Sequence, residues 1–382
     1  MLRQSIIIII VVLIVSSTTS AETTTEISGE YSVTGTYIDE DNNDYQYYSH
    51  ELDVFATIKN DATILKTEIE ITDKTWGDKT VEDDGSEFEL DRAWLTHHFE
   101  EGFRLEVGKM TGGVWGTMLG DEEDGYYRVK ATKTFGETTL TGYLQKNIEN
   151  GSTDPILEDD EKDDSDAASI GIIHKMGDIA LMPKVSYTNN SDALDNQDYD
   201  GDQELRLVFA AIGNFNSVTF ETEINYIDFT TDRAGASDYS IGTAWLDVNI
   251  NLTALTAGIS FAYGMEDNGA GHGTFGTDFT PMVLMDNDDG VIANLGGMML
   301  ARIYASSQPT QNLTTGCAFA YGDYNEDAHP TKNSDTEIME LDITARYAIT
   351  EALSYSASIA YADIKSEEDG ILQIEHELVF RF

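Results

Sequence analysis

Residues 370–382 alternate between apolar and polar side chains at the end of the chain. Every second position from the C-terminus carries an apolar or aromatic side chain except one, in the order Phe382, Phe380, Leu378, His376, Ile374 and Leu372. Because successive side chains of a β-strand point to opposite faces, this period of two predicts a strand with one apolar face. A strand of this kind suits the wall of a membrane barrel, and it also suits a soluble sandwich.

The same alternation recurs from residue 27 onward, in segments joined by either a short turn or a long polar loop. We expect strands over residues 27–38, 48–59, 63–71, 87–99, 103–110, 125–135, 137–147, 168–176, 179–188, 204–212, 215–229, 237–250, 252–264, 295–307, 312–324, 336–349, 352–364 and 371–382. Short turns on one rim and long loops on the other predict an all-β, antiparallel, up-and-down transmembrane barrel of about 16–18 strands. A soluble β-sandwich, β-helix or propeller is the alternative, although the segments show no fixed repeat period.

The N-terminus has the pattern of an export signal. Arg3 precedes an apolar run over residues 6–15, and small and hydroxylated residues follow up to Ala21. This pattern predicts a signal peptide over residues 1–21 and a mature barrel domain over residues 22–382. No later apolar run reaches the roughly 18 residues that a transmembrane helix needs, so a membrane-spanning form of this chain requires a closed barrel.

The balance of charges narrows the class of partner. The chain carries 70 acidic and 22 basic residues, which gives a formal net charge of −48. Such a field repels the phosphates of nucleic acids and concentrates cations, so we predict no nucleic-acid partner. Soluble halophilic proteins are also acidic, and charge alone does not decide the fold class. Cys317 is the single cysteine, and it therefore forms no intramolecular disulfide.

Two segments resemble a strand pair found in many Gram-negative outer-membrane porins. Residues 88–95 (FELDRAWL) and 103–109 (FRLEVGK) are similar to the pattern ELxRAxL…GxxLxVGK of that family. The export signal, the array of hairpins and the terminal Phe382 extend the resemblance over the whole chain. The expected strand number is nearer to the substrate-specific channels than to the 16-stranded general porins, and the subfamily stays open.

The resemblance implies a function and partners. A porin lies in outer-membrane lipid and forms a water-filled channel for passive diffusion of small hydrophilic solutes and ions. The resemblance also implies a homotrimer, and an assembly signal at Leu378, Phe380 and Phe382 that the barrel-assembly machinery reads. The alternative from another class is a surface adhesin or structural barrel, with a closed lumen and acidic loops that bind a partner.

In porins the third long loop folds into the barrel and narrows the pore, and here that loop spans residues 111–124. We expect Trp115 and Met118 to anchor it on the wall. Its acidic residues would place negative charge at the constriction: Asp121, Glu122, Glu123 and Asp124. The alternative is a solvated surface loop.

Basic residues on polar strand faces are expected on the wall opposite this loop, where they would create a transverse field: Arg104, Arg128, Lys130, Arg206 and Arg346. The alternative is that they pair with acids on neighbouring strands, such as Glu106, Glu204 or Asp342. Because the net charge is strongly negative, we predict a preference for cations.

The remaining motifs are weak. The apolar part of the longest loop, residues 265–294, is expected to pack over or into the mouth of the barrel, where a ligand platform is an alternative. Residues 196–201 copy the first half of a calcium-binding loop, but Leu207 holds the place of its closing glutamate. The chain has no G-x-S-x-G or H-E-x-x-H motif, so we predict no enzyme activity, no metal site and no cofactor.

Overall fold

The computed structural model describes residues 23–40, 43–73, 87–111, 115–120, 125–148, 165–190, 202–231, 238–264, 266–267, 271–272, 275, 279–285, 292, 297–324, 337–365 and 370–382. Its elements are, in chain order, β1 (Thr23–Glu40), β2 (Asn43–Asn60), β3 (Thr63–Asp73), β4 (Glu87–His98), η1 (Glu100–Gly102), β5 (Phe103–Thr111), η2 (Met118–Gly120), β6 (Gly125–Phe135), β7 (Thr138–Ile148), β8 (Ser165–Met176), β9 (Ile179–Asn190), β10 (Asp202–Phe215), β11 (Val218–Thr230), β12 (Tyr239–Asn251), β13 (Leu255–Gly264), β14 (Glu266–Asp267), β15 (Gly271–His272), β16 (Met298–Thr310), β17 (Leu313–Tyr324), β18 (Glu337–Ala348), β19 (Leu353–Ile364) and β20 (Ile371–Arg381).

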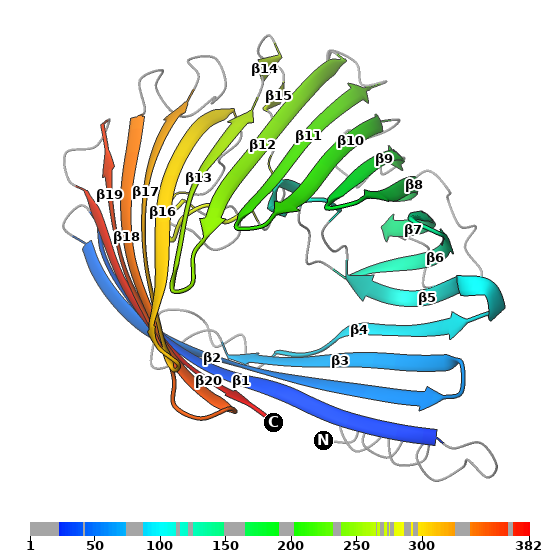
Figure 1. Cartoon of the computed structure of the whole chain (residues 1–382), viewed down its shortest axis with the longest axis horizontal. Helices are drawn as coiled ribbons and strands as arrows, with labels where there is room; N and C mark the ends of the chain where they lie inside the picture. The colour runs from blue at the N-terminus through cyan, green and yellow to red at the C-terminus, as the bar shows by residue number, and fades with distance from the viewer. Residues whose placement is uncertain are drawn as a thin grey trace, which may run out of the picture.

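The strands form one closed, 18-stranded antiparallel barrel (Figure 1). Each long strand pairs with the next along the chain, and β1 pairs with β20 to close the ring, with Tyr31 opposite Phe380. The two short strands β14 and β15 pair only with each other. This arrangement confirms the predicted up-and-down barrel and gives it the larger of the two expected strand numbers.

Short turns gather at one rim. Gly136 and Gly177 have φ values of 56° and 61° in the turns β6–β7 and β8–β9, a left-handed conformation that glycine adopts without steric cost. Asp61 and Asn216 take the same conformation in two further turns. The N–H of Arg381 donates to the carbonyl oxygen of Ala352 in the β18–β19 turn, so the chain ends at this rim. Every connection at the other rim contains residues outside the described ranges.

The outer face of the wall is apolar. Leu144, Ile224, Ile303 and Ile343 are each more than half exposed, and they alternate with polar residues that face inward. Such a surface is unusual around a water-soluble monomer and matches the lipid-facing band of a membrane barrel. In the described part of the chain, no helix has the length and apolarity needed to cross a membrane.

A buried apolar cluster of the described residues lies inside the barrel. Its wall residues come from β12, β13, β16 to β20 and β1, and its other members come from two loop segments. Figure 1 shows these segments inside the ring, one in teal near β10 and β11 and one in yellow beside β16. The lumen is therefore partly filled by the chain's own loops.

Candidate functional site

Residues 115–120 of the third long loop pack against the inner wall of β8 to β11 (Figure 1). The indole Nε1 of Trp115 donates a hydrogen bond to the carbonyl oxygen of Met182 in β9, at 3.1 Å. The indole also lies against Gly171 of β8, where any side-chain carbon would collide with it. Gly171 follows the outward-facing Ile170, so Trp115 occupies the lumen side of the wall.

Glu223 of β11 fastens the same segment. Its Oε2 accepts hydrogen bonds from the N–H of Thr117 at 2.7 Å and from the Thr117 hydroxyl at 3.0 Å. Gly116 has a φ of 99°, and a side-chain carbon there would lie 2.5 Å from Cβ of Ala210 and 2.5 Å from Oε2 of Glu223. Glycine is therefore required for this close approach to the wall.

The structure places the predicted constriction residues as follows. Trp115 contacts the inner wall, and Met118 packs against the buried apolar cluster that contains Leu119. The acidic residues 121–124 and the calcium-like residues 196–201 lie outside the described residues. The roles of Trp115 and Met118 as anchors, and of this loop as the pore constriction, stay predictions.

A second segment, residues 279–285 of the longest loop, packs on the wall of β12, β13 and β16 to β20. Phe279 is fully buried, with its ring edge-on to Trp245 of β12 at 5.6 Å between centroids and stacked on Phe275 at 4.6 Å. Leu119 of the first segment belongs to the same cluster. The two loops therefore share one apolar contact region inside the barrel, as expected for the apolar part of residues 265–294.

All five predicted bases lie on inward faces, between outward apolar residues: Arg104, Arg128, Lys130, Arg206 and Arg346. Two of them are paired within their own strands. Nε of Arg104 lies 3.1 Å from Oε2 of Glu106, and Nε of Arg206 lies 3.0 Å from Oε1 of Glu204. For these two bases the structure matches the alternative of local ion pairing.

Arg128 lies on the same wall as the first inward segment, not opposite it. Its guanidinium donates to the carbonyl oxygen of Thr111 at 2.9 Å, and Cζ lies 4.5 Å from the ring centroid of Tyr143. Lys184, which the sequence reasoning missed, lies 5.6 Å from the Tyr143 centroid and 5.9 Å from that of Trp115. The rings of Tyr143 and Trp115 attract the cationic side chains of Arg128 and Lys184 and so keep positive charge beside the loop.

An acid-rich arc covers the inner face of β1 to β4. Carboxylate oxygens of Glu51, Asp53 and Glu70 all lie within 4.8 Å of one another. Arg92 offsets part of this charge further along the arc. Its Nη1 lies 3.2 Å from Oε2 of Glu68, and its Nε lies 2.9 Å from Oδ2 of Asp91. Beside it, the inner faces of β5, β6 and β9 carry the bases described above, so acids and bases occupy neighbouring arcs of the lumen.

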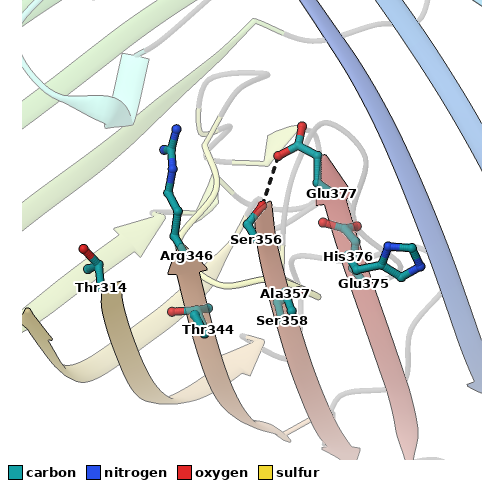
Figure 2. Close-up of a pocket in the computed structure, with 10 residues that line it drawn as sticks. Thr314, Thr344, Arg346, Ser356, Ala357, Ser358, Glu375, His376 and Glu377 are labelled. Atoms are coloured by element: carbon teal, nitrogen blue, oxygen red, sulfur yellow. Dashed lines mark hydrogen bonds between the residues drawn. The ribbon is translucent and has the colours of Figure 1, made fainter. Parts of the chain in front are cut away.

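Arg346 stands apart from the other bases, on β18 and across the lumen from β6 (Figure 1). It lines a hollow of about 160 Å³, and the other polar residues in the lining include Thr314, Thr344, Ser356, Ser358, Glu375 and Glu377. Figure 2 shows Arg346 and Glu377 on either side of Ser356, whose hydroxyl donates to Oε2 of Glu377 at 3.2 Å. Within the described residues, the one hydrogen bond of the Arg346 guanidinium goes to Ser354 at 3.4 Å. This wall therefore offers a guanidinium and carboxylates that are not paired with each other.

Comparison with known proteins gives matches in structure and none in sequence. No family model and no curated protein matches the chain. Among solved structures, OccK2 (OpdF) of Pseudomonas aeruginosa, in complex with glucuronate, has a TM-score of 0.66 at 9% identity over 94% of this chain and 98% of its own. OpdK of the same organism has a TM-score of 0.63 at 10% identity, covering 94% of this chain and 99% of its own. A BenF-like porin of Pseudomonas fluorescens Pf-5 has a TM-score of 0.64 at 10% identity, covering 94% and 98%.

The chain has the fold of the outer-membrane porins. At 9–10% identity the likeness shows the fold alone, so the description of the site rests on the contacts in this chain. Trp115 lies in a loop, so its position inside the barrel comes from its contacts with Met182 and Gly171 and not from strand alternation. Strand alternation turns Glu223 and Lys184 toward the lumen, but in the sequence they look like ordinary polar-face residues. Their partners lie tens of residues away, and no local pattern reveals them.

Proposed function

We propose that the protein is an outer-membrane channel through which small hydrophilic solutes and ions diffuse passively. The observation that carries this proposal is a closed 18-stranded barrel with an apolar outer face and a charged inner wall. A closed barrel satisfies all backbone hydrogen bonds in lipid, and inward polar residues keep water in the lumen. Two loop segments fill part of the lumen, and we propose that the space beside them is a narrowed path for solutes.

We further propose that the channel prefers cations. The acid-rich arc of Glu51, Asp53 and Glu70 and the net charge of −48 support this preference. The test is planar-bilayer recording of the refolded protein under a KCl gradient. Discrete steps with a reversal potential on the potassium side are expected. Discrete steps with a reversal potential on the chloride side would support the channel function but refute the preference for cations.

The solute class follows the same reasoning. Two solved neighbours were crystallised with glucuronate and with vanillate, and both ligands are carboxylates. In this chain the acidic arc favours the opposite charge. Proteoliposome swelling with glucosamine and with glucuronate, two sugars of similar size and opposite charge, is expected to be faster with glucosamine. Faster swelling with glucuronate would instead assign the channel to carboxylates.

Export and assembly are proposed from the sequence. Residues 1–21 would be removed as a signal peptide, so the mature chain purified from membranes is expected to begin at Glu22 by N-terminal sequencing. Leu378, Phe380 and Phe382 face outward at the rim and would present the signal to the barrel-assembly machinery. A homotrimer is proposed on the resemblance alone, and mass photometry in detergent would test it.

One observation favours a second candidate, a structural or adhesive barrel with a closed lumen. Phe279, Leu284, Met285 and Leu119 are fully buried inside the barrel, which shows that apolar loop residues fill part of the path. A folded, heat-modifiable barrel that never conducts in bilayers, in any variant described below, would select this candidate.

A further inference from the structure

The second inward segment is held by an unusual set of hydrogen bonds. Three successive backbone N–H groups point at two carboxylates of β18: Val283 donates to Oδ2 of Asp342 at 3.1 Å, Leu284 to Oε1 of Glu340 at 2.6 Å and Met285 to Oε2 of Glu340 at 2.9 Å. Successive amides that converge in this way form an anion-binding concavity, or nest. Here the anion is a side chain of the barrel's own wall.

The segment is shaped to present these amides. The N–H of Met282 donates to the carbonyl oxygen of Met285 at 3.3 Å, which curls the backbone into a turn. The carbonyl oxygen of Leu284 accepts from Ile292 at 2.9 Å, which ties the turn to a later part of the same loop. These two hydrogen bonds give the docked turn a fixed shape, and its apolar side chains belong to the same buried cluster as residues of the wall.

The carboxylates need these donors when the segment is docked. Glu340 is fully buried and Asp342 is 4% exposed, inside a cluster that contains Leu300, Ile338 and Phe279. A buried charge without hydrogen bonds is costly, and the three amides together with the electrostatic interaction between Asp342 and Arg302 offset that cost. If the segment left the wall, the same carboxylates would face the water of the lumen. Water would then replace the amides, and it would also reach Oδ1 of Asp342, which has no hydrogen-bond partner among the described residues when the segment is docked.

The connections of the loop set the direction of movement. β13 ends at Gly264 and β16 begins at Met298, both at the rim opposite the short turns. A released segment therefore swings toward the mouth and takes its apolar residues out of the lumen. An apolar constriction resists the passage of hydrated ions because water leaves it readily.

We propose that residues 279–285 form an apolar gate, that Glu340 and Asp342 are its latch, and that release of the latch opens the wider path through the barrel. This inference rests on the proposed channel function. Glu340 and Asp342 are positioning residues, because they act through the loop that they hold.

The test combines two readouts on the full-length, refolded protein. Glu340→Gln replaces one of the two acceptor oxygens by an NH₂ group at constant size. Glu377→Gln is the matched control, since Glu377 is also a lumen glutamate, two strands away on β20, but bonds to Ser356 and not to the loop. Gate position is followed by maleimide labelling of Met285→Cys in a Cys317→Ser background, and flow is followed by single-channel conductance. Phe279→Ala, which loosens the loop without altering the wall, guards against a folding defect in the first variant.

With the gate as proposed, Glu340→Gln and Phe279→Ala each raise both the labelling rate and the conductance several-fold, and Glu377→Gln changes neither to that extent. Unchanged labelling in both variants would overturn the gate. Faster labelling with equal conductance would also overturn it, while the channel function would stand. Faster labelling with no conductance in any variant would show that Glu340 holds the loop but that the barrel is not a channel. This result would overturn both the gate and the proposed channel function.

Discussion

Glu223 of β11 and Trp245 of β12 are direct cross-strand partners, and each of them holds one of the two inward loops. Glu223 accepts two hydrogen bonds from Thr117, while Trp245 packs edge-on against Phe279. The indole Nε1 of Trp245 also donates to Glu221 at 3.1 Å, which fixes the orientation of its ring. The two loops follow different strands, β5 and β13, but their anchors thus lie on neighbouring strands of the wall. A shift in one anchor is therefore expected to reach the other.

Loosening Glu223 tests this connection. Glu223→Gln replaces two hydrogen bonds to a charged oxygen by weaker neutral ones, at a cost of about 1–2 kcal/mol to the docked segment. Amide hydrogen exchange in residues 115–120 is expected to speed up, with a smaller increase in residues 279–285. Glu377→Gln serves as the control and leaves both segments unchanged. Faster exchange confined to residues 115–120 would show that the two anchors act independently.

Gly171 offers a steric test of the first segment. Gly171→Val places side-chain carbons where the Trp115 indole now lies, so the indole must leave the wall and lose its hydrogen bond to Met182. Tryptophan fluorescence is expected to shift to the red, and the single-channel current is expected to become noisier. Gly142→Val is the control, because the nearest atom to a side-chain carbon there is 3.5 Å away. Equal spectra for the two variants would refute the placement of Trp115.

The acid-rich arc predicts the ion preference. Asp53→Asn combined with Glu70→Gln removes two lumen charges from a group whose oxygens lie within 4.8 Å of one another. The reversal potential under a KCl gradient is expected to move toward zero, because the field that concentrates potassium weakens. Asp178→Asn changes one charge in an exposed turn and is expected to have little effect. If Asp178→Asn shifted the reversal potential as much as the double variant, the overall charge and not the acid-rich arc would set the preference for cations.

The seam between the first and last strands predicts a stability effect. Gly29 and Phe382 exchange two backbone hydrogen bonds of 3.0 Å, and a side-chain carbon at Gly29 would collide with the Phe382 ring. Gly29→Ala is therefore expected to destabilise barrel closure by about 1–3 kcal/mol. The readout is the temperature at which the compact band on unheated gels disappears. Gly142→Ala has room for its methyl group and should leave that temperature unchanged.

Much of the fold was predictable because its signal is local. Phe382, Phe380 and Leu378 alternate with inward residues, and similar alternation predicts the other long strands. In residues 87–99 the alternation has no clear phase, and there the β3–β4 pair contains a shift in register. Trp115 was predictable as an anchor, since a large aromatic in a glycine-rich loop needs a surface on which to pack. The bases were expected on the wall opposite the loop, but Arg128 lies on the same wall as the loop. Its position beside Tyr143 depends on which strands become neighbours of the loop.

The sequence by itself determined the barrel, because a period of two and short turns are properties of nearby residues. Only the tertiary structure decided what fills the lumen. The amides of Leu284 and Met285 meet Glu340 across separations of 56 and 55 residues, and Thr117 meets Glu223 across 106. Contacts at such separations depend on barrel closure and on the path of each loop. A glutamate on the polar face of a strand looks the same in the sequence whether it faces water or holds a loop in place.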